Sequence, residues 1–201
     1  MSAFTTLRGR RAATALAAIA TLLAAPLPVR ADPNCLPITA PLLQIGQVPC
    51  GQVLPQLQAS GQFPDVFAGA GKVLGLCYAA TGPAPAQIGN IPVTITNTLS
   101  AWTTDFNPIL VGGPDHLGTV VTQVTVSGSH GLLSAHYYTR DTIDLSQILT
   151  TGTAAEEDVI VGGDSLLFGA KGTYRVASQP VNGNPALVDL NNLAGLICTL
   201  F

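Results

Sequence analysis

The chain has 201 residues, of which 47% are hydrophobic and only 9% are charged, and its formal net charge is −3. This length suits one domain with a hydrophobic core of its own. The acidic balance excludes the basic footprint that nucleic-acid binding requires, and it disfavours attraction to an anionic membrane surface.

The N-terminal segment has the pattern of a secretory signal. Three arginines precede an apolar run over residues 12–27, and the small residue Ala31 ends the segment. We therefore expect residues 1–31 to be removed on export, which leaves the protein secreted, periplasmic or on a cell surface, without a membrane anchor. An uncleaved N-terminal anchor is the alternative. Residues 32–201 keep four basic residues against 11 acidic ones, a net charge of −7.

Four cysteines follow this signal, namely Cys35, Cys50, Cys77 and Cys198. An even number of cysteines in an exported chain indicates two disulfides, for which three pairings exist. Because Cys198 lies near the C-terminus, we expect one bridge to tie that end to the N-terminal half. Free buried thiols are the alternative, and the absence of a Cys-x-x-Cys pair makes a zinc site a poor interpretation.

Residues 32–90 are rich in Pro, Gln and Gly, and the stretch 33–104 holds only two charged side chains. Repeated Pro and Gly breaks predict an irregular, disulfide-tied segment with one short helix, packed on the main domain. Residues 66–80 are apolar and small, and their pattern fits a buried strand or a helix equally well.

From residue 91 the pattern changes to short strands separated by turns. Apolar and polar side chains alternate, and Gly, Asn and Pro mark the breaks. The candidate strands are residues 91–99, 119–127, 132–145, 159–161 and 173–177, followed by 187–201 as a strand or short helix. We therefore predict an all-β domain over residues 91–201, built as an antiparallel barrel or a sandwich.

The segment from Val159 to Ala177 carries a family resemblance. Its centre reads Gly162-Gly163-Asp164-Ser165-Leu166-Leu167-Phe168-Gly169-Ala170-Lys171-Gly172. This is similar to the pattern Gly-Gly-Thr-Gly-x-Phe-x-x-Ala-x-Gly of the dirigent and allene-oxide-cyclase-like barrels. Gly162, Gly163, Ala170 and Gly172 match it, whereas Asp164, Ser165 and Leu167 replace Thr, Gly and Phe.

The resemblance implies a calycin-type barrel that encloses an apolar cavity with few polar groups. Members of such families guide the cyclisation or coupling of reactive small molecules, so no cofactor is expected. In physical terms, Gly162, Gly163 and Gly172 have structural roles, because glycine permits tight turns and close backbone approach.

The strand over residues 132–145 holds the densest polar set, divided between two faces. We expect His136, Tyr138, Arg140 and Asp144 to line the cavity as catalytic acid, base and orienting groups. The opposite face carries the odd-numbered residues of the same strand. Tyr174 and Gln123 are the expected ligand-binding residues.

The alternative is a solvated outer face with ordinary cross-strand pairs. Arg140 would then form a surface ion pair with Asp141 or Asp144, which contributes little to stability.

Other patterns predict little chemistry. The histidines His116, His130 and His136 with Asp115 lack a short ligand pair, so no metal is expected. Ser165 does not stand in a Gly-x-Ser-x-Gly elbow, which argues against a serine hydrolase. The acids Glu156, Glu157 and Asp158 resemble a paired-carboxylate site, but adjacent acids in one loop are usually solvated.

The sequence thus predicts an exported barrel that binds a small apolar or phenolic ligand, with a cofactor-independent cyclase or dirigent-like activity as its catalytic form. The alternative is a non-enzymatic secreted interaction or structural protein. The nearly uncharged stretch 33–104 supports this alternative, because a large uncharged surface often packs against a partner or another copy.

Overall fold

The computed structural model describes residues 34–68, 74–103, 117–128, 134–147 and 150–199. The expected signal over residues 1–31 lies outside the described residues, as do His116, His130 and Asp115. Within the described ranges, no helix is both long and apolar enough to cross a membrane.

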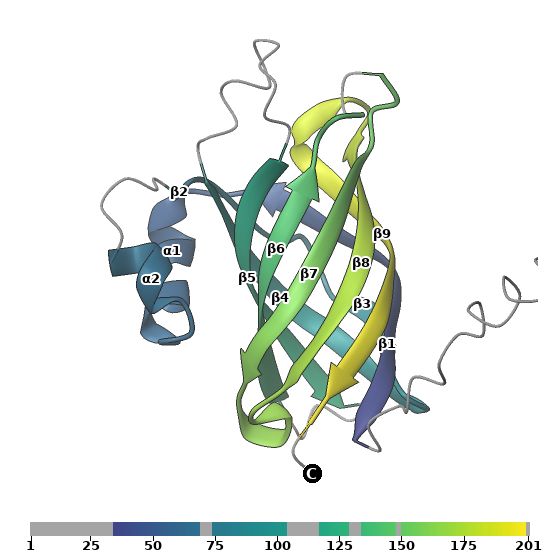
Figure 1. Ribbon diagram of the computed structural model, residues 1–201. Helices are drawn as coiled ribbons and strands as arrows, with labels where there is room; N and C mark the ends of the chain where they lie inside the picture. The colour runs from purple at the N-terminus through teal and green to yellow at the C-terminus, as the bar shows by residue number, and fades with distance from the viewer. Residues whose placement is uncertain (1–33, 69–73, 104–116, 129–133, 148–149, 200–201) are drawn as a thin grey trace, which may run out of the picture. The chain divides into compact units, whose positions relative to one another are not determined.

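Strands dominate the described chain, and the helices are few and short (Figure 1). The elements are β1 (Cys35–Gln47), α1 (Cys50–Ala59), α2 (Pro64–Ala68), β2 (Leu74–Ala80), β3 (Ala84–Ile88), β4 (Ile91–Thr103), β5 (Leu117–Gly128), β6 (Ser134–Asp144), β7 (Ala154–Gly163), the 3-10 turn η2 (Ser165–Leu167), β8 (Lys171–Val181) and β9 (Asn184–Cys198).

The strands form a closed antiparallel barrel of eight strands with one extra strand, which confirms the all-β barrel. From β3 to β9, each strand pairs with the next along the chain. The barrel closes where β1 pairs with β9, from Cys35 opposite Cys198 to Gly46 opposite Leu187. A closed barrel has no exposed sheet edge and divides every strand into an inward and an outward face.

Two short strands share one place in the wall. β2 pairs with the ends of β1 and β4 that lie near Ile45 and Ala101, whereas β3 pairs with their opposite ends. The break between β2 and β3 contains Gly82 and Pro83, and proline cannot donate to a ladder. The two strands therefore follow one another along a single position between β1 and β4.

The expected boundary at residue 91 is wrong, because residues 32–90 supply β1, β2 and β3 as well as both helices. β1 buries alternate side chains such as Ile38 and Ala40, while Pro37 and Pro41 lie on its outer face. These prolines break the apparent pattern in the sequence, yet they occupy positions that the barrel wall tolerates.

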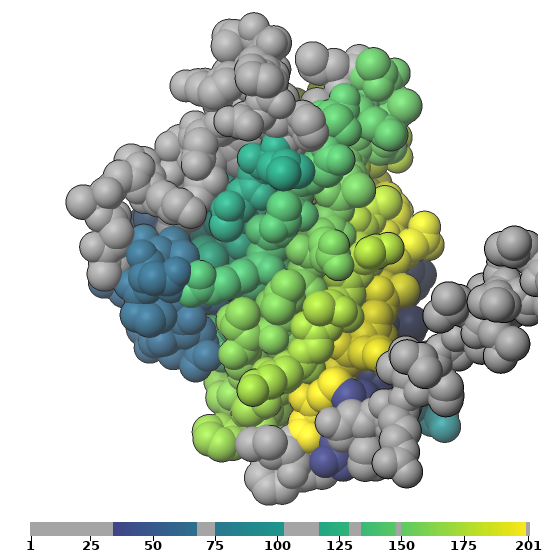
Figure 2. Space-filling view, viewed as in Figure 1, coloured from purple at the N-terminus to yellow at the C-terminus, as the bar shows by residue number. Residues whose placement is uncertain are grey.

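A second, smaller core lies outside the barrel, under α1. Val53 and Leu57 lie four residues apart on α1 and are fully buried, because they pack with Leu99, Val121 and other outward side chains of the wall. Figure 2 shows the two helices in blue against the wall, while the side chains of β6 to β9 form an unbroken outer surface beside them. Because the helical segment covers them, outward residues such as Leu99 and Val121 are as buried as inward ones.

A β-bulge in β4 changes which side chains reach the interior. The register of β4 against β5 shifts between Ile95 and Asn97. Before the shift Ile95 lines the cavity, and after it Thr98, Ser100 and Trp102 do so. The expected face of alternating apolar residues therefore points inward only up to the bulge, after which polar side chains enter the barrel.

Two of the glycines in the resemblance segment lie where a side chain would meet backbone. A Cβ atom at Gly163 would clash with the carbonyl oxygen of Leu167, and one at Gly172 would clash with that of Leu196. Gly172 also has a φ of 145°, which side chains rarely permit. Gly162 faces the side chain of Gln62. These contacts agree with the structural roles expected for the three glycines.

The four cysteines form two disulfides, Cys35–Cys198 and Cys50–Cys77. The first confirms the expected bridge between the C-terminus and the N-terminal half, and it lies at the end of the β1–β9 ladder. The second ties the start of α1 to β2, which holds the helix on the barrel wall.

Replacing Cys35 and Cys198 together by serine should lower the free energy of unfolding by about 3–5 kcal/mol, because the bridge closes a loop with a sequence separation of 163. The Cys50→Ser/Cys77→Ser control should lose less, since its separation is 27. Chemical denaturation followed by circular dichroism measures both losses. An unchanged free energy of unfolding after removal of the Cys35–Cys198 bridge would contradict this prediction.

Candidate functional site

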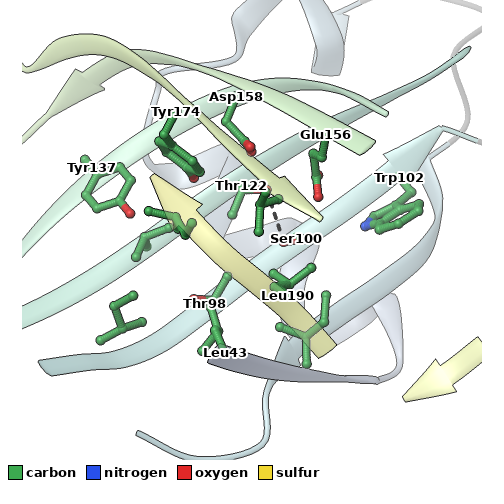
Figure 3. A pocket seen from close by; sticks show the side chains of 15 residues that line it. Leu43, Thr98, Ser100, Trp102, Thr122, Tyr137, Glu156, Asp158, Tyr174 and Leu190 are labelled. Carbon is green, nitrogen blue, oxygen red and sulfur yellow. Dashed lines mark hydrogen bonds between the residues drawn. The ribbon is translucent and has the colours of Figure 1, made fainter. Parts of the chain in front are cut away.

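The candidate site is the polar centre of the barrel (Figure 3). Inward side chains surround a cavity of about 20 Å³, which is room for about one water molecule. Of the 15 side chains that line it, seven are aliphatic and eight carry a polar group, namely Thr98, Ser100, Trp102, Thr122, Tyr137, Glu156, Asp158 and Tyr174.

Three carboxyl groups meet in this interior. Asp141 on β6 and Glu156 and Asp158 on β7 are 1%, 7% and 3% exposed, respectively. Asp141 lies directly opposite Asp158 in the β6–β7 ladder. One oxygen from each of the three carboxyls lies within 4.8 Å of the other two. The strict alternation of β7 explains this arrangement, because it turns Glu156 and Asp158 inward and Glu157 outward.

A short chain of hydroxyl groups supports Asp141. The hydroxyl of Thr122 donates to Oδ2 of Asp141 at 2.7 Å. The hydroxyls of Ser100 and Thr122 lie 3.1 Å apart, which Figure 3 marks with a dashed line. Since Thr122 has one proton and donates it to Asp141, Ser100 must donate to Thr122. This order fixes one oxygen of Asp141 as an acceptor.

Several buried oxygens in the same region have no hydrogen-bond partner. They are the hydroxyls of Thr98, Tyr137 and Thr139, Oδ1 of Asp141 and Oδ2 of Asp158. Tyr137 is fully buried, and Figure 3 shows its hydroxyl pointing toward the middle of the cavity, as do the carboxyls of Glu156 and Asp158. Unpartnered buried polar atoms are unusual and destabilise a folded protein.

The interior has no positive side chain to balance the acids. In the described part of the chain the cationic side chains are His136, Arg140, Lys171 and Arg175, and all four lie on the outer surface of the wall. Two charged carboxylate oxygens within 4.8 Å of each other repel by at least about 3 kcal/mol at an effective dielectric constant near 20. The three acids cannot all be ionised unless positive charge is supplied.

Burial raises the pKa of all three carboxyls, and their mutual repulsion contributes further. Burial and the neighbouring Asp141 raise the pKa of Glu156 to about 8. The pKa values of Asp141 and Asp158 are also raised, first by burial. Burial likewise raises the pKa of the phenols of Tyr137 and Tyr174. In the absence of a cation, the cluster therefore keeps protons at neutral pH.

The set expected to line the cavity points the other way, so that expectation is wrong. The inward residues of β6 are Tyr137, Thr139 and Asp141, whereas the expected set consists of His136, Tyr138, Arg140 and Asp144. The physical reason is the second core, since α1 and its neighbours cover the outer face and bury Tyr138 there. Both faces of β6 thus carry buried side chains, and polarity alone does not distinguish them.

The outward face of β6 joins a structural network around Asp164. Nδ1 of His136 lies 2.9 Å from Oδ2 of Asp164, and the hydroxyl of Tyr138 donates to the same oxygen at 3.2 Å. Partial burial alone would raise the pKa of Asp164, but the backbone N–H and ring of His136 lower it. The network fixes the turn between β7 and β8 against β6.

Arg140 pairs with neither Asp141 nor Asp144, the two partners expected from the sequence. Its guanidinium donates to Asp65 on α2, with one nitrogen–oxygen distance of 2.7 Å, and this contact lowers the pKa of Asp65 to about 2. Asp144 instead accepts the backbone N–H of Ser146 at 2.8 Å, a contact within a turn. Arg140 therefore links the helical segment to the wall.

The two expected ligand-binding residues divide between the faces. Tyr174 on β8 lines the cavity, as expected. Gln123 does not, because β5 turns Thr122 and Val124 inward and Gln123 outward, opposite Tyr138.

Sequence reasoning missed the acids that lie in the interior. Glu156, Glu157 and Asp158 were expected in a solvated loop, but only Glu157 is exposed. The available signal was the spacing of Ala154, Glu156, Asp158 and Ile160, which stand at every second position of the segment. This is the period of a strand, but the high charge of the segment favours a solvated loop when the sequence is considered alone.

Comparison with family models, with curated proteins and with solved structures finds no match to this chain. The resemblance to the dirigent and allene-oxide-cyclase-like barrels therefore stays a prediction, and the function is argued from the geometry of the interior.

Raising the pH from about 5 to about 8 in the presence of EDTA should destabilise the folded protein. The folded state holds the Glu156 proton up to a pKa of about 8, against an ordinary value of 4.5, so it binds more protons than the unfolded state in this interval. Stability must then fall as pH rises. Thermal unfolding across the range should show the fall in wild type and in Glu157→Gln, and a flatter profile in Glu156→Gln. A wild-type Tm that rises over this interval would falsify the argument.

Proposed function

We propose that the protein is an exported barrel that binds a small ligand at its polar centre. The observation that carries the proposal is the meeting of three carboxyls, two of which line the cavity, with unpartnered hydroxyls and no balancing positive charge in the described interior. Such a cluster of buried carboxyls and hydroxyls destabilises the folded protein unless a bound ligand balances its charge and pairs its polar atoms. Such unfavourable clusters are typical of functional sites.

Export is part of the proposal and rests on two observations. The N-terminal pattern is typical of a secretory signal, and the described chain contains two disulfides and no free cysteine. Disulfides form and persist mainly in oxidising compartments. The two observations support the same location independently.

A second candidate is proton transfer to a small apolar or phenolic molecule, as the family resemblance implies. The aromatic lining favours it, since the rings of Tyr137 and Tyr174 meet edge to face with centroids 6.2 Å apart beside Asp158. A cyclase or dirigent-like reaction would use these acids and phenols without a cofactor. The cavity of about 20 Å³ holds only a water-sized guest, so an organic molecule would require side chains of the lining to move.

Native mass spectrometry of the non-reduced protein, purified from the medium of a secreting host, tests the proposal. We expect a mass above that of the bare chain, which denaturation removes, and the difference identifies the ligand class. Asp158→Asn should lose this excess because it removes one charge from the centre. Glu157→Gln is the matched control, since it changes an exposed neighbour on the same strand.

An excess that Asp158→Asn retains would place the ligand elsewhere and contradict the proposal. A bare mass in wild type, combined with a defined oligomer, would favour the non-enzymatic interaction protein instead.

A further inference from the structure

We propose that the ligand of the barrel centre is a single hard divalent cation, of which Ca²⁺ fits best, held by Asp141, Glu156 and Asp158. This inference deepens the proposed function, because it names the ligand of the same site. It makes the barrel a cation-binding protein and makes its stability dependent on that cation.

The donor set is the first argument. Three carboxylates offer only oxygen, which hard cations such as Ca²⁺ prefer, and no thiol or imidazole points to the same place. The oxygens lie within 4.8 Å of one another. Mg²⁺ requires near-octahedral geometry and usually keeps several bound waters, whereas Ca²⁺ accepts a more flexible geometry. A cavity of about 20 Å³ has no room for several waters, so Ca²⁺ fits this site better than Mg²⁺ does.

The unpartnered oxygens are an independent second argument. Oδ1 of Asp141 and Oδ2 of Asp158 have no donor beside them while both carboxyls are ionised, so both are open to a cation. Without a cation, a proton between Asp141 and Asp158 takes its place. The hydroxyl of Tyr137, which belongs to a fully buried side chain, also lacks a partner and points into the cavity. A cation would satisfy the carboxylate oxygens directly.

The size and charge of the site favour a small cation over an organic ligand. A cavity of about 20 Å³ admits an ion or one water but no organic ammonium group. The described interior holds no Lys, Arg or His, so a divalent cation replaces the positive charge that the protein does not provide. The second oxygen of Asp141 is already fixed by Thr122, which orients this carboxyl before the ion arrives.

The disulfide-intact protein, stripped with EDTA and equilibrated with Ca²⁺ or Mg²⁺ before heating, tests this inference. When free Ca²⁺ is about a hundred times its Kd, the Tm of wild type should rise by about 5–10 °C, and Mg²⁺ should act more weakly. Asp158→Asn should fold without metal, because a neutral amide replaces a carboxyl that is protonated in the metal-free protein, but it should show no rise. Glu157→Gln should respond as wild type does.

A direct count of bound metal accompanies the thermal test. Mn²⁺, followed by electron paramagnetic resonance, should bind one ion per chain in wild type and in Glu157→Gln, but none in Asp158→Asn. Folded wild type that neither binds Mn²⁺ nor gains stability from Ca²⁺ overturns the inference, as does an equal response in Asp158→Asn. If native mass spectrometry then still shows an organic ligand that depends on Asp158, the proposed function stands and only the cation is wrong. If neither is bound, both fail.

Discussion

The pairing of β1 with β9 is the constraint on which the rest of the structure depends. This antiparallel ladder closes the sheet, and the Cys35–Cys198 bridge fastens its end. Once the sheet is closed, each strand has one face that water cannot reach, so alternation along the sequence becomes a division between an interior and an outer wall. The polar centre forms because the inward faces of β6 and β7 bring Asp141, Glu156 and Asp158 together in the interior.

The interior acids are costly to the fold and are therefore informative about function. Inward positions of small barrels are usually filled by apolar side chains, and most of this interior follows that rule. Asp141, Glu156 and Asp158 depart from it together, at one level of the barrel, with hydroxyls arranged around them. A single buried acid is weak evidence of function, whereas three acids that meet support the proposal of a site that receives positive charge or protons.

Much of the fold could be predicted from the sequence, because turns and alternation are local signals. The strands that begin at residue 91 follow from such local signals, whereas the bridge from Cys198 to the N-terminal half follows from the even number of cysteines and their positions. The site could not be predicted in the same way. Which face of β6 points inward depends on α1, which covers the other face, and the inward turn of Thr98 depends on a bulge in β4. Both are tertiary effects that no single segment encodes.

The alternation of β7 has a consequence for how the strand finds its partners. A slip of one residue would turn Glu157 inward and release Glu156 and Asp158 to water, so the slipped pairing would bury one carboxyl where the native pairing buries two. Charge alone therefore favours the wrong alignment. The native alignment is held by the contacts at the end of the strand, where Gly163 packs closely against Leu167 and Asp164 binds His136. A ligand that recognises the assembled acids would thus also select the correct register as the barrel closes.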